Sequence, residues 1–110
     1  MKTAFVYMTA GSVEEARKIG RALIEGRLAA CVNIVPGMTS LYRWQGKVEE
    51  GSETVLIAKT RADLVQELTE RVMALHSYTV PCVVSIPIEG GNSAFLDWIE
   101  AETAAPTATV

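Results

Sequence analysis

The sequence predicts an α+β fold with the element order β-α-β-β-α-β and a short C-terminal helix. Apolar segments of strand length alternate with two segments in which apolar residues recur at helical spacing. The two middle strands are separated only by Gln45-Gly46, which predicts a tight hairpin. This order is that of the ferredoxin-like split β-α-β fold. Right-handed crossovers would place both helices on one face of an antiparallel sheet, and the other face would have no helix unless the C-terminal helix wraps around it.

The first strand is expected at Ala4 to Met8, followed by a helix whose start has the residues of a capping box. Ser12 can accept from the backbone of the first turn, and Glu15 can reach back to the chain before it. Gly26 is expected to close this helix, because glycine tolerates the positive φ of many helix ends.

The hairpin is expected to run from Ala29 to Trp44 and back from Lys47 to Thr60, with a bend or bulge at Pro36-Gly37. Each arm can reach roughly 45 to 50 Å at about 3.3 Å per residue. The two helices, at about 14 residues, reach only about 21 Å. The outer half of the hairpin therefore needs cover from other copies of the chain. The residues predicted for this subunit interface are Leu41, Tyr42, Trp44 and Val48.

The second helix is expected to start near Thr60 or Arg61 and to end at His76. A strand from Pro81 to Ile88 has a proline near each end, which favours an edge position. A third helix is expected from Ser93 to about Glu102. Residues 1–103 are expected to form one domain, and the Ala/Thr/Pro-rich residues 104–110 a disordered tail.

Composition excludes several classes of function. The chain has 110 residues, 10 basic against 13 acidic side chains and a net charge of -3, with no basic run, so neither nucleic acid nor an anionic membrane is an expected partner. No apolar run is long enough for a bilayer span or a secretory leader. The two cysteines, 51 positions apart, indicate free thiols in a reducing compartment, and the expected location is cytoplasmic.

No catalytic site is expected, because no nucleophile can be placed beside the single histidine, His76. That histidine has two interpretations. A cationic imidazole is favoured at a helix C-terminus. Alternatively, the imidazole joins a soft sulfur from Met8, Cys31 or Cys82, a ligand set that suits copper or another thiophilic ion. Cys31 lies in a strand, where a buried core position is the competing interpretation.

A second group of residues would suit a small anion at a cleft between subunits. Lys59 ends a strand beside helix-capping residues, although a solvated lysine is common at such a position. Aromatic side chains of this kind are more often part of the core or an interface than of a ligand site. The residues of this alternative ligand cleft are Lys59, His76, Tyr78 and Trp98.

Three separated segments closely resemble the CutA divalent-cation tolerance family. They are Ala29 to Glu50 (AACVNIVPGMTSLYRWQGKVEE), Lys59-Thr60-Arg61 and Leu75 to Pro81. The resemblance extends from about Ala4 to Glu102. It implies a homotrimer of ferredoxin-like subunits, similar in architecture to the PII signalling proteins, with the hairpins exchanged between neighbours. It also implies tolerance to copper and other divalent ions.

In copper-binding bacterial members of that family, the ligands are a cysteine near the end of the first strand and two adjacent histidines after the second helix. The matching positions here are Met8, Leu75 and His76, so the resemblance implies weaker binding or binding of a softer ion. A Ser77 follows His76 where proline is common, which implies a less rigid turn.

The resulting hypothesis is a non-catalytic trimer that acts in the response to divalent metal ions, with Met8, Cys31 and His76 as metal ligands. Copper or another divalent ion would be bound, but no cofactor is obligatory. The alternative is a PII-like signalling module that binds a small anionic metabolite at intersubunit clefts and is read by an unidentified protein partner. A third option is that the trimer is a structural scaffold whose main property is its stability.

Overall fold

The computed structural model describes residues 2–104 of the chain, so residues 105–110 of the tail predicted at 104–110 lie outside them. The elements are β1 (Thr3–Ala10), α1 (Val13–Glu25), β2 (Cys31–Trp44), β3 (Lys47–Arg61), α2 (Val65–Leu75), β4 (Val83–Ile88) and α3 (Ser93–Glu102). A 3-10 turn, Ala62–Leu64, leads into α2. The predicted α+β class and element order are confirmed, although α2 begins later than expected because β3 continues to Arg61.

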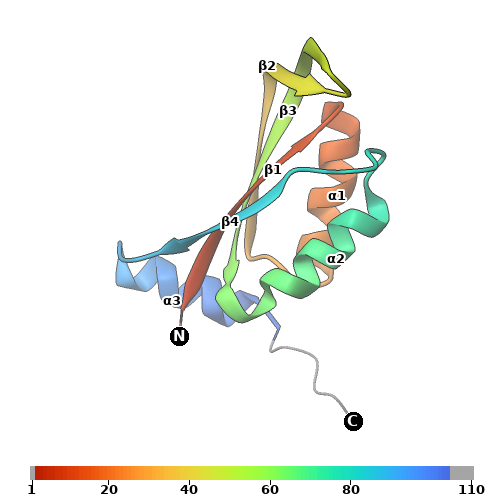
Figure 1. Ribbon diagram of the computed structural model, residues 1–110. Coiled ribbons are helices and arrows are strands. Elements are labelled where there is room, and N and C mark those ends of the chain that lie inside the picture. Colours follow the sequence, from red (N-terminus) through yellow and green to blue (C-terminus); the bar gives the residue numbers. More distant parts are fainter. Residues whose placement is uncertain (1, 105–110) are drawn as a thin grey trace.

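The four strands form one antiparallel sheet in the order β2-β3-β1-β4, which is the ferredoxin-like order. Helices α1 and α2 lie on one side of this sheet, and α3 lies on the other side at one end (Figure 1). The strands β2 and β4 are the edges, as the two prolines near the ends of β4 predict.

The core lies between the sheet and the helices α1 and α2. Alternate residues of β1, namely Ala4, Val6, Met8 and Ala10, are buried on this face. They pack with Ile19 and Leu23 of α1, Leu68 and Val72 of α2, and Leu56 and Ala58 of β3. We call this the helix face of the sheet and the opposite side the bare face. Because paired residues share a face, the bare face carries rows such as Ile86, Phe5, Lys59 and Cys31.

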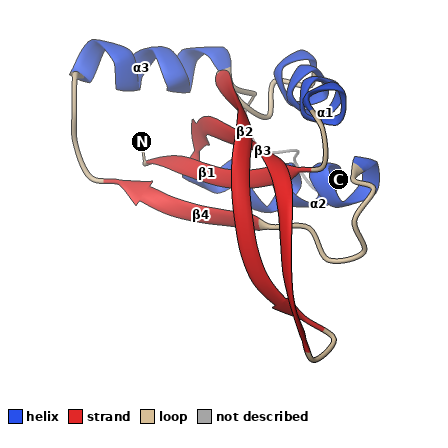
Figure 2. Cartoon of the chain, turned by 90° about the horizontal axis from the view of Figure 1, so that it is seen from above, coloured by secondary structure: helices blue, strands red, loops and turns tan. Residues whose placement is uncertain are grey.

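The hairpin of β2 and β3 extends well beyond the helices, as predicted (Figure 2). Every residue from 41 to 50 is exposed in the single chain. The turn residues Gln45 and Gly46 have φ values of 52° and 81°, the pattern of a type I′ turn. Between Val35 and Met38 the pairing with β3 slips, so the predicted bulge at Pro36-Gly37 is confirmed, with Gly37 at a φ of 79°.

The end of α1 differs from the prediction. Gly26 caps the helix in the right-handed region, and the left-handed residue is Arg27, with a φ of 58°. Backbone bonds explain the positive φ, because Arg27 N–H donates to Ile24 O and Leu28 N–H to Leu23 O, the two bonds of a Schellman motif. The guanidinium of Arg27 donates to the carbonyl oxygens of Ala101 and Glu102 at 3.1 and 3.4 Å. The carbonyl of Arg27 accepts from the backbone N–H of Ala104 at 2.8 Å. Arg27 therefore fastens the end of α3 to the end of α1.

Candidate functional site

A polar junction forms where β1, α1 and α2 end or begin close together. His76 is the C-cap of α2, and its backbone N–H donates to Val72 O. Its ring Nδ1 accepts from the backbone N–H of Tyr78 at 3.0 Å, so the ring proton lies on Nε2, which donates to Thr9 O at 2.7 Å. The side chain is fully buried. We call these residues, together with Glu15 and Ser77, the His76 junction.

Glu15 connects the start of α1 to this junction. Ser12 Oγ accepts from the Glu15 N–H at 3.1 Å, as the capping box predicts. The Glu15 carboxylate, however, reaches Gly11 N at 3.2 Å with one oxygen and Ser77 N at 2.7 Å with the other. Burial alone would raise the pKa of Glu15, but these hydrogen bonds and the nearby His76 outweigh it and hold the pKa below 4.5.

The three residues expected to bind metal do not converge within one chain. Met8 is buried on the helix face. Cys31 lies on the bare face, because it pairs with Lys59, which pairs with Phe5. His76 contacts the carbonyl of Thr9, the residue after Met8, yet both of its ring nitrogens already have protein partners. A metal ion would have to displace the Tyr78 N–H to reach Nδ1.

Cys31 is the half-buried member of this set and has polar neighbours. Its sulfur lies 3.7 Å from Asn33 Oδ1 and 3.9 Å from Lys59 Nζ, and Lys59 also donates to Asn33 Oδ1. Across residues 2–104, no group of three or more His, Cys, Asp or Glu side chains could hold a metal ion. A copper site made from Met8, Cys31 and His76 therefore does not fit a single subunit.

The residues of the alternative anion cleft are likewise divided. His76 and Tyr78 are in ring contact, with centroids 4.6 Å apart. Tyr78 Oη donates to Glu53, which lies six residues before Lys59 along β3, or about 20 Å in an extended strand. Trp98 lies on α3 and contacts Phe95. The acidic groups that act on Tyr78 are the carboxylates of Glu53 and Glu15, so this part of one subunit does not suit an anion.

The structure does form a cleft beside the His76 junction, which we call the aromatic cleft. It has a volume of about 450 Å³. It is bounded by the end of β1, the outer parts of β2 and β3, and the loop between α2 and β4. The lining residues are Thr9, Tyr42, Trp44, Glu53, Ser77, Tyr78, Thr79, Val80 and Cys82.

Charges in the aromatic cleft are set by Glu53. Burial, the hydrogen bond to Glu53 and the charge of Glu53 together raise the pKa of Tyr78 to about 12. Burial, and then the same carboxylate, raise the pKa of the Cys82 thiol. Both groups are therefore neutral near pH 7, and Glu53 supplies the negative charge of the cleft.

Sequence reasoning did not find Glu53, and it assigned Glu15 only to the capping box. Both carboxylates accept hydrogen bonds from the α2–β4 loop: Glu15 from the backbone N–H of Ser77, and Glu53 from the hydroxyl of Tyr78. These partners are 62 and 25 positions away in the sequence, so no local pattern could have indicated them.

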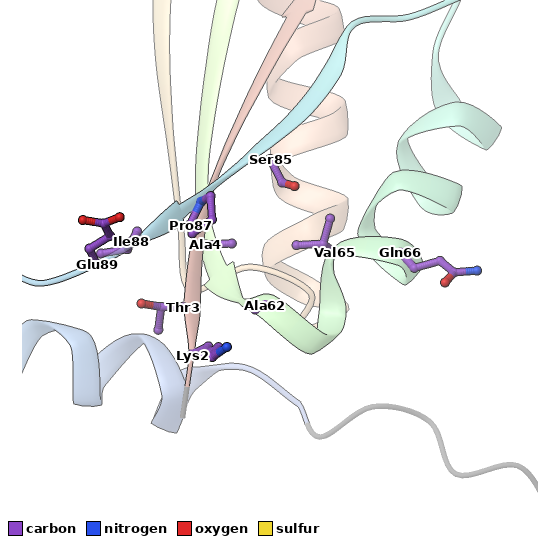
Figure 3. A pocket seen from close by; sticks show the side chains of 10 residues that line it. All are labelled: Lys2, Thr3, Ala4, Ala62, Val65, Gln66, Ser85, Pro87, Ile88 and Glu89. Carbon is purple, nitrogen blue, oxygen red and sulfur yellow. The ribbon is translucent and has the colours of Figure 1, made fainter.

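A second hollow, of about 790 Å³, lies beside the free edge of β4 near the start of α2 (Figure 3). Val65 and Gln66 bound it on the α2 side, and Ser85 and Pro87 on the β4 side. Lys2 and Glu89 stand at its rim (Figure 3). It contains none of the residues predicted for a site, and its lining has no thiol or imidazole.

The four hairpin residues predicted for a subunit interface are all exposed in the single chain. Leu41 and Val48 are the most exposed, at 68% and 69%. Tyr42 and Trp44 pair with Glu49 and Lys47, on the same face of the ribbon as Glu53, whereas Leu41 and Val48 occupy the other face. The hairpin therefore presents apolar groups on both of its sides.

The fold and this surface define the class of protein: a ferredoxin-like domain with a projecting hairpin that exposes apolar side chains on both of its sides. The chain belongs to the CutA1 divalent ion tolerance protein family, whose pattern it matches over residues 4–102.

Similar proteins agree with this assignment. The chain is 55% identical over 98 residues to the divalent-cation tolerance protein CutA of Thermus thermophilus, covering 89% of this chain and 95% of that protein. It is 47% identical over 98 residues to the chloroplastic CutA protein of Arabidopsis thaliana, covering 89% of this chain and 54% of that protein. The crystal structure of CutA1 from Oryza sativa is 44% identical, with a TM-score of 0.92 over 94% of this chain and 95% of that one. Within residues 2–104, no helix has the length and apolar character that crossing a bilayer requires.

Proposed function

We propose that this chain is a non-catalytic homotrimeric protein that acts in the response to divalent metal ions and binds copper-type ions weakly. Membership of the divalent ion tolerance family over residues 4–102 is the observation that carries the proposal. The scattered positions of Met8, Cys31 and His76 favour weak binding, because one subunit provides no chelating set.

The two free edges of the sheet support the trimer. Among residues 2–104 of one chain, no further strand pairs with the outer edge of β2 or of β4. A β2 edge of one copy can pair with a β4 edge of the next, and such a head-to-tail contact closes into a ring. The exposed apolar groups Val84 and Ile86 of β4 and Leu41 and Val48 of the hairpin would be covered in that ring.

Light scattering tests the assembly. A folded sample at micromolar concentration is expected to have a mass close to three times the 11.9 kDa of one chain. A mass near 11.9 kDa would remove the trimer from the proposal.

Calorimetry tests the metal claim. Cu(II), and Cu(I) under reducing conditions, are titrated into the wild type, Cys31→Ala and His76→Ala. We expect Cys31→Ala to lower the Cu(I) affinity, because its sulfur is partly accessible. His76→Ala is expected to leave it unchanged, because the ring is fully buried. Negligible heats in all three proteins would remove metal binding from the proposal and leave the trimer untouched.

A further inference from the structure

The aromatic cleft has walls that suit one kind of ligand. Three aromatic side chains line it: Tyr42 and Trp44 from β2, and Tyr78 from the α2–β4 loop. Tyr42 and Trp44 lie on the bare-face side of the hairpin, where their register places them on the same face as Glu53. Aromatic rings attract cations through the negative potential of their faces, and Trp does so most strongly.

Glu53 is the only charged side chain among the lining residues. Its Oε2 accepts from Tyr78 Oη at 3.1 Å, which fixes the carboxylate against one of the rings. Among residues 2–104, Tyr78 is its only hydrogen-bonding partner, so the other oxygen is available to a ligand. Since no lysine or arginine lines the cleft, its net charge is negative.

We infer that the aromatic cleft binds a small organic ammonium ion, held over the rings of Tyr42, Trp44 and Tyr78 and paired with the carboxylate of Glu53. The volume of about 450 Å³ lies within the range of small-molecule sites. An organic anion would be repelled by the carboxylate of Glu53, and no lysine or arginine among the lining residues would offset that repulsion. A bare divalent metal ion would find one carboxylate and a protonated thiol, fewer ligands than such ions require.

All nine lining residues belong to one chain, so the cleft does not need a neighbour to form. Tyr42 and Trp44 are also predicted for the subunit interface, so in the proposed trimer a neighbouring subunit would border the mouth of the cleft. The experiment therefore uses the full chain in its assembled state. The experiment is independent of the proposed metal binding. A quaternary ammonium ion cannot accept a lone pair from sulfur or imidazole, so it does not bind as a metal ion would.

The chain has only two tryptophans, and they serve as probe and internal reference. Trp44 lines the cleft, whereas Trp98 lies on α3. Tetramethylammonium chloride is titrated into ¹⁵N-labelled protein, and both indole N–H signals are followed by NMR against equal additions of NaCl. We expect a saturable shift of the Trp44 signal and none of the Trp98 signal. tert-Butanol, a neutral molecule of similar size, is expected to give no saturable shift.

Glu53→Gln keeps the shape of the side chain and an oxygen for Tyr78 but removes the charge. We expect it to weaken tetramethylammonium binding at least threefold. Glu50→Gln is the matched control, because Glu50 pairs with Leu41 on the other face of the same strand pair, and it is expected to bind as the wild type does. Tyr42→Leu, which removes a ring and leaves the charge, is expected to weaken binding as well.

Three results would each overturn the inference. One is an unsaturable or absent Trp44 shift in the folded, assembled protein. Another is an equal response to tert-butanol, which would indicate an apolar hollow with no preference for charge. The third is an unchanged affinity in Glu53→Gln.

Discussion

The imidazole of His76 joins the backbone of Thr9, 67 positions before it in the sequence, to that of Tyr78, two positions after it: its Nε2 donates to Thr9 O at 2.7 Å, while its Nδ1 accepts from the N–H of Tyr78. One buried ring thus connects the end of β1 with the loop that leads into β4. In one subunit this ring is a structural crosslink, since no lone pair remains for a metal ion.

His76→Ala is expected to lower the free energy of unfolding by roughly 2 to 3 kcal/mol, because it leaves two backbone groups without partners and opens a cavity. Urea denaturation followed by circular dichroism measures the change. Thr79→Ala is the control, because Thr79 is an exposed residue of the same loop outside the His76 junction. A loss below about 0.5 kcal/mol for His76→Ala would contradict the crosslinking role.

The acid stability of the protein is expected to depend on Glu15. Its pKa in the folded protein is below 4.5, so the folded state favours the charged form. The contribution of Glu15 to the free energy of unfolding is therefore complete above about pH 4.5, the pKa expected in the unfolded chain. This contribution is lost as the pH falls through the lower pKa of the folded state. Glu15→Gln should flatten the fall in melting temperature between about pH 5 and pH 3. Glu14→Gln, on the exposed side of the same turn, should leave that fall unchanged.

Arg27 is expected to hold α3 in place. Arg27→Ala removes the two guanidinium bonds to Ala101 and Glu102 and keeps the strained positive φ. We expect faster backbone hydrogen exchange in α3, with the sheet amides unchanged. Arg27→Gly relieves the backbone strain but also loses the anchor, so α3 should exchange quickly in it too. If exchange in α3 matches the wild type in both variants, the anchoring role is wrong.

The turn of the hairpin can be improved. Gln45 has a positive φ, which a side chain other than Asn, Asp or Gly adopts at a cost. Gln45→Asn creates the Asn-Gly pair preferred in type I′ turns and should stabilise the protein by up to about 1 kcal/mol per subunit. Thermal unfolding measures this. Gln66→Asn, in an exposed helix position, should instead lower the melting temperature slightly, because asparagine is the poorer helix former.

Sequence patterns predicted the features that depend on neighbours in the chain. The capping contact of Ser12, the turn at Gln45-Gly46 and the bulge at Pro36-Gly37 are local, and all three are present. The expected position of His76 at the end of α2 is also confirmed.

Features set by strand register could not be read in the same way. Met8 and Cys31 face opposite sides of the sheet because of how three strands align, and that alignment joins residues far apart in sequence. Arg27 takes a backbone conformation expected of glycine, and its side chain is anchored on α3, 75 positions away in the sequence. The aromatic cleft arises only when the hairpin and the α2–β4 loop meet.

The slip between Val35 and Met38 inserts one unmatched residue into β2, and an odd insertion inverts the inside-outside alternation of everything beyond it. Because of the slip, Tyr42 and Trp44, which are even-numbered, share the face of Glu53, whereas before it the odd-numbered residues of β2, such as Cys31, occupy that face. Deleting Gly37 would remove the unmatched residue and leave Met38 opposite Glu53, so every pair from Met38 to Trp44 would be kept. The hairpin can therefore lose one residue at this position and keep the same side chains on each of its sides.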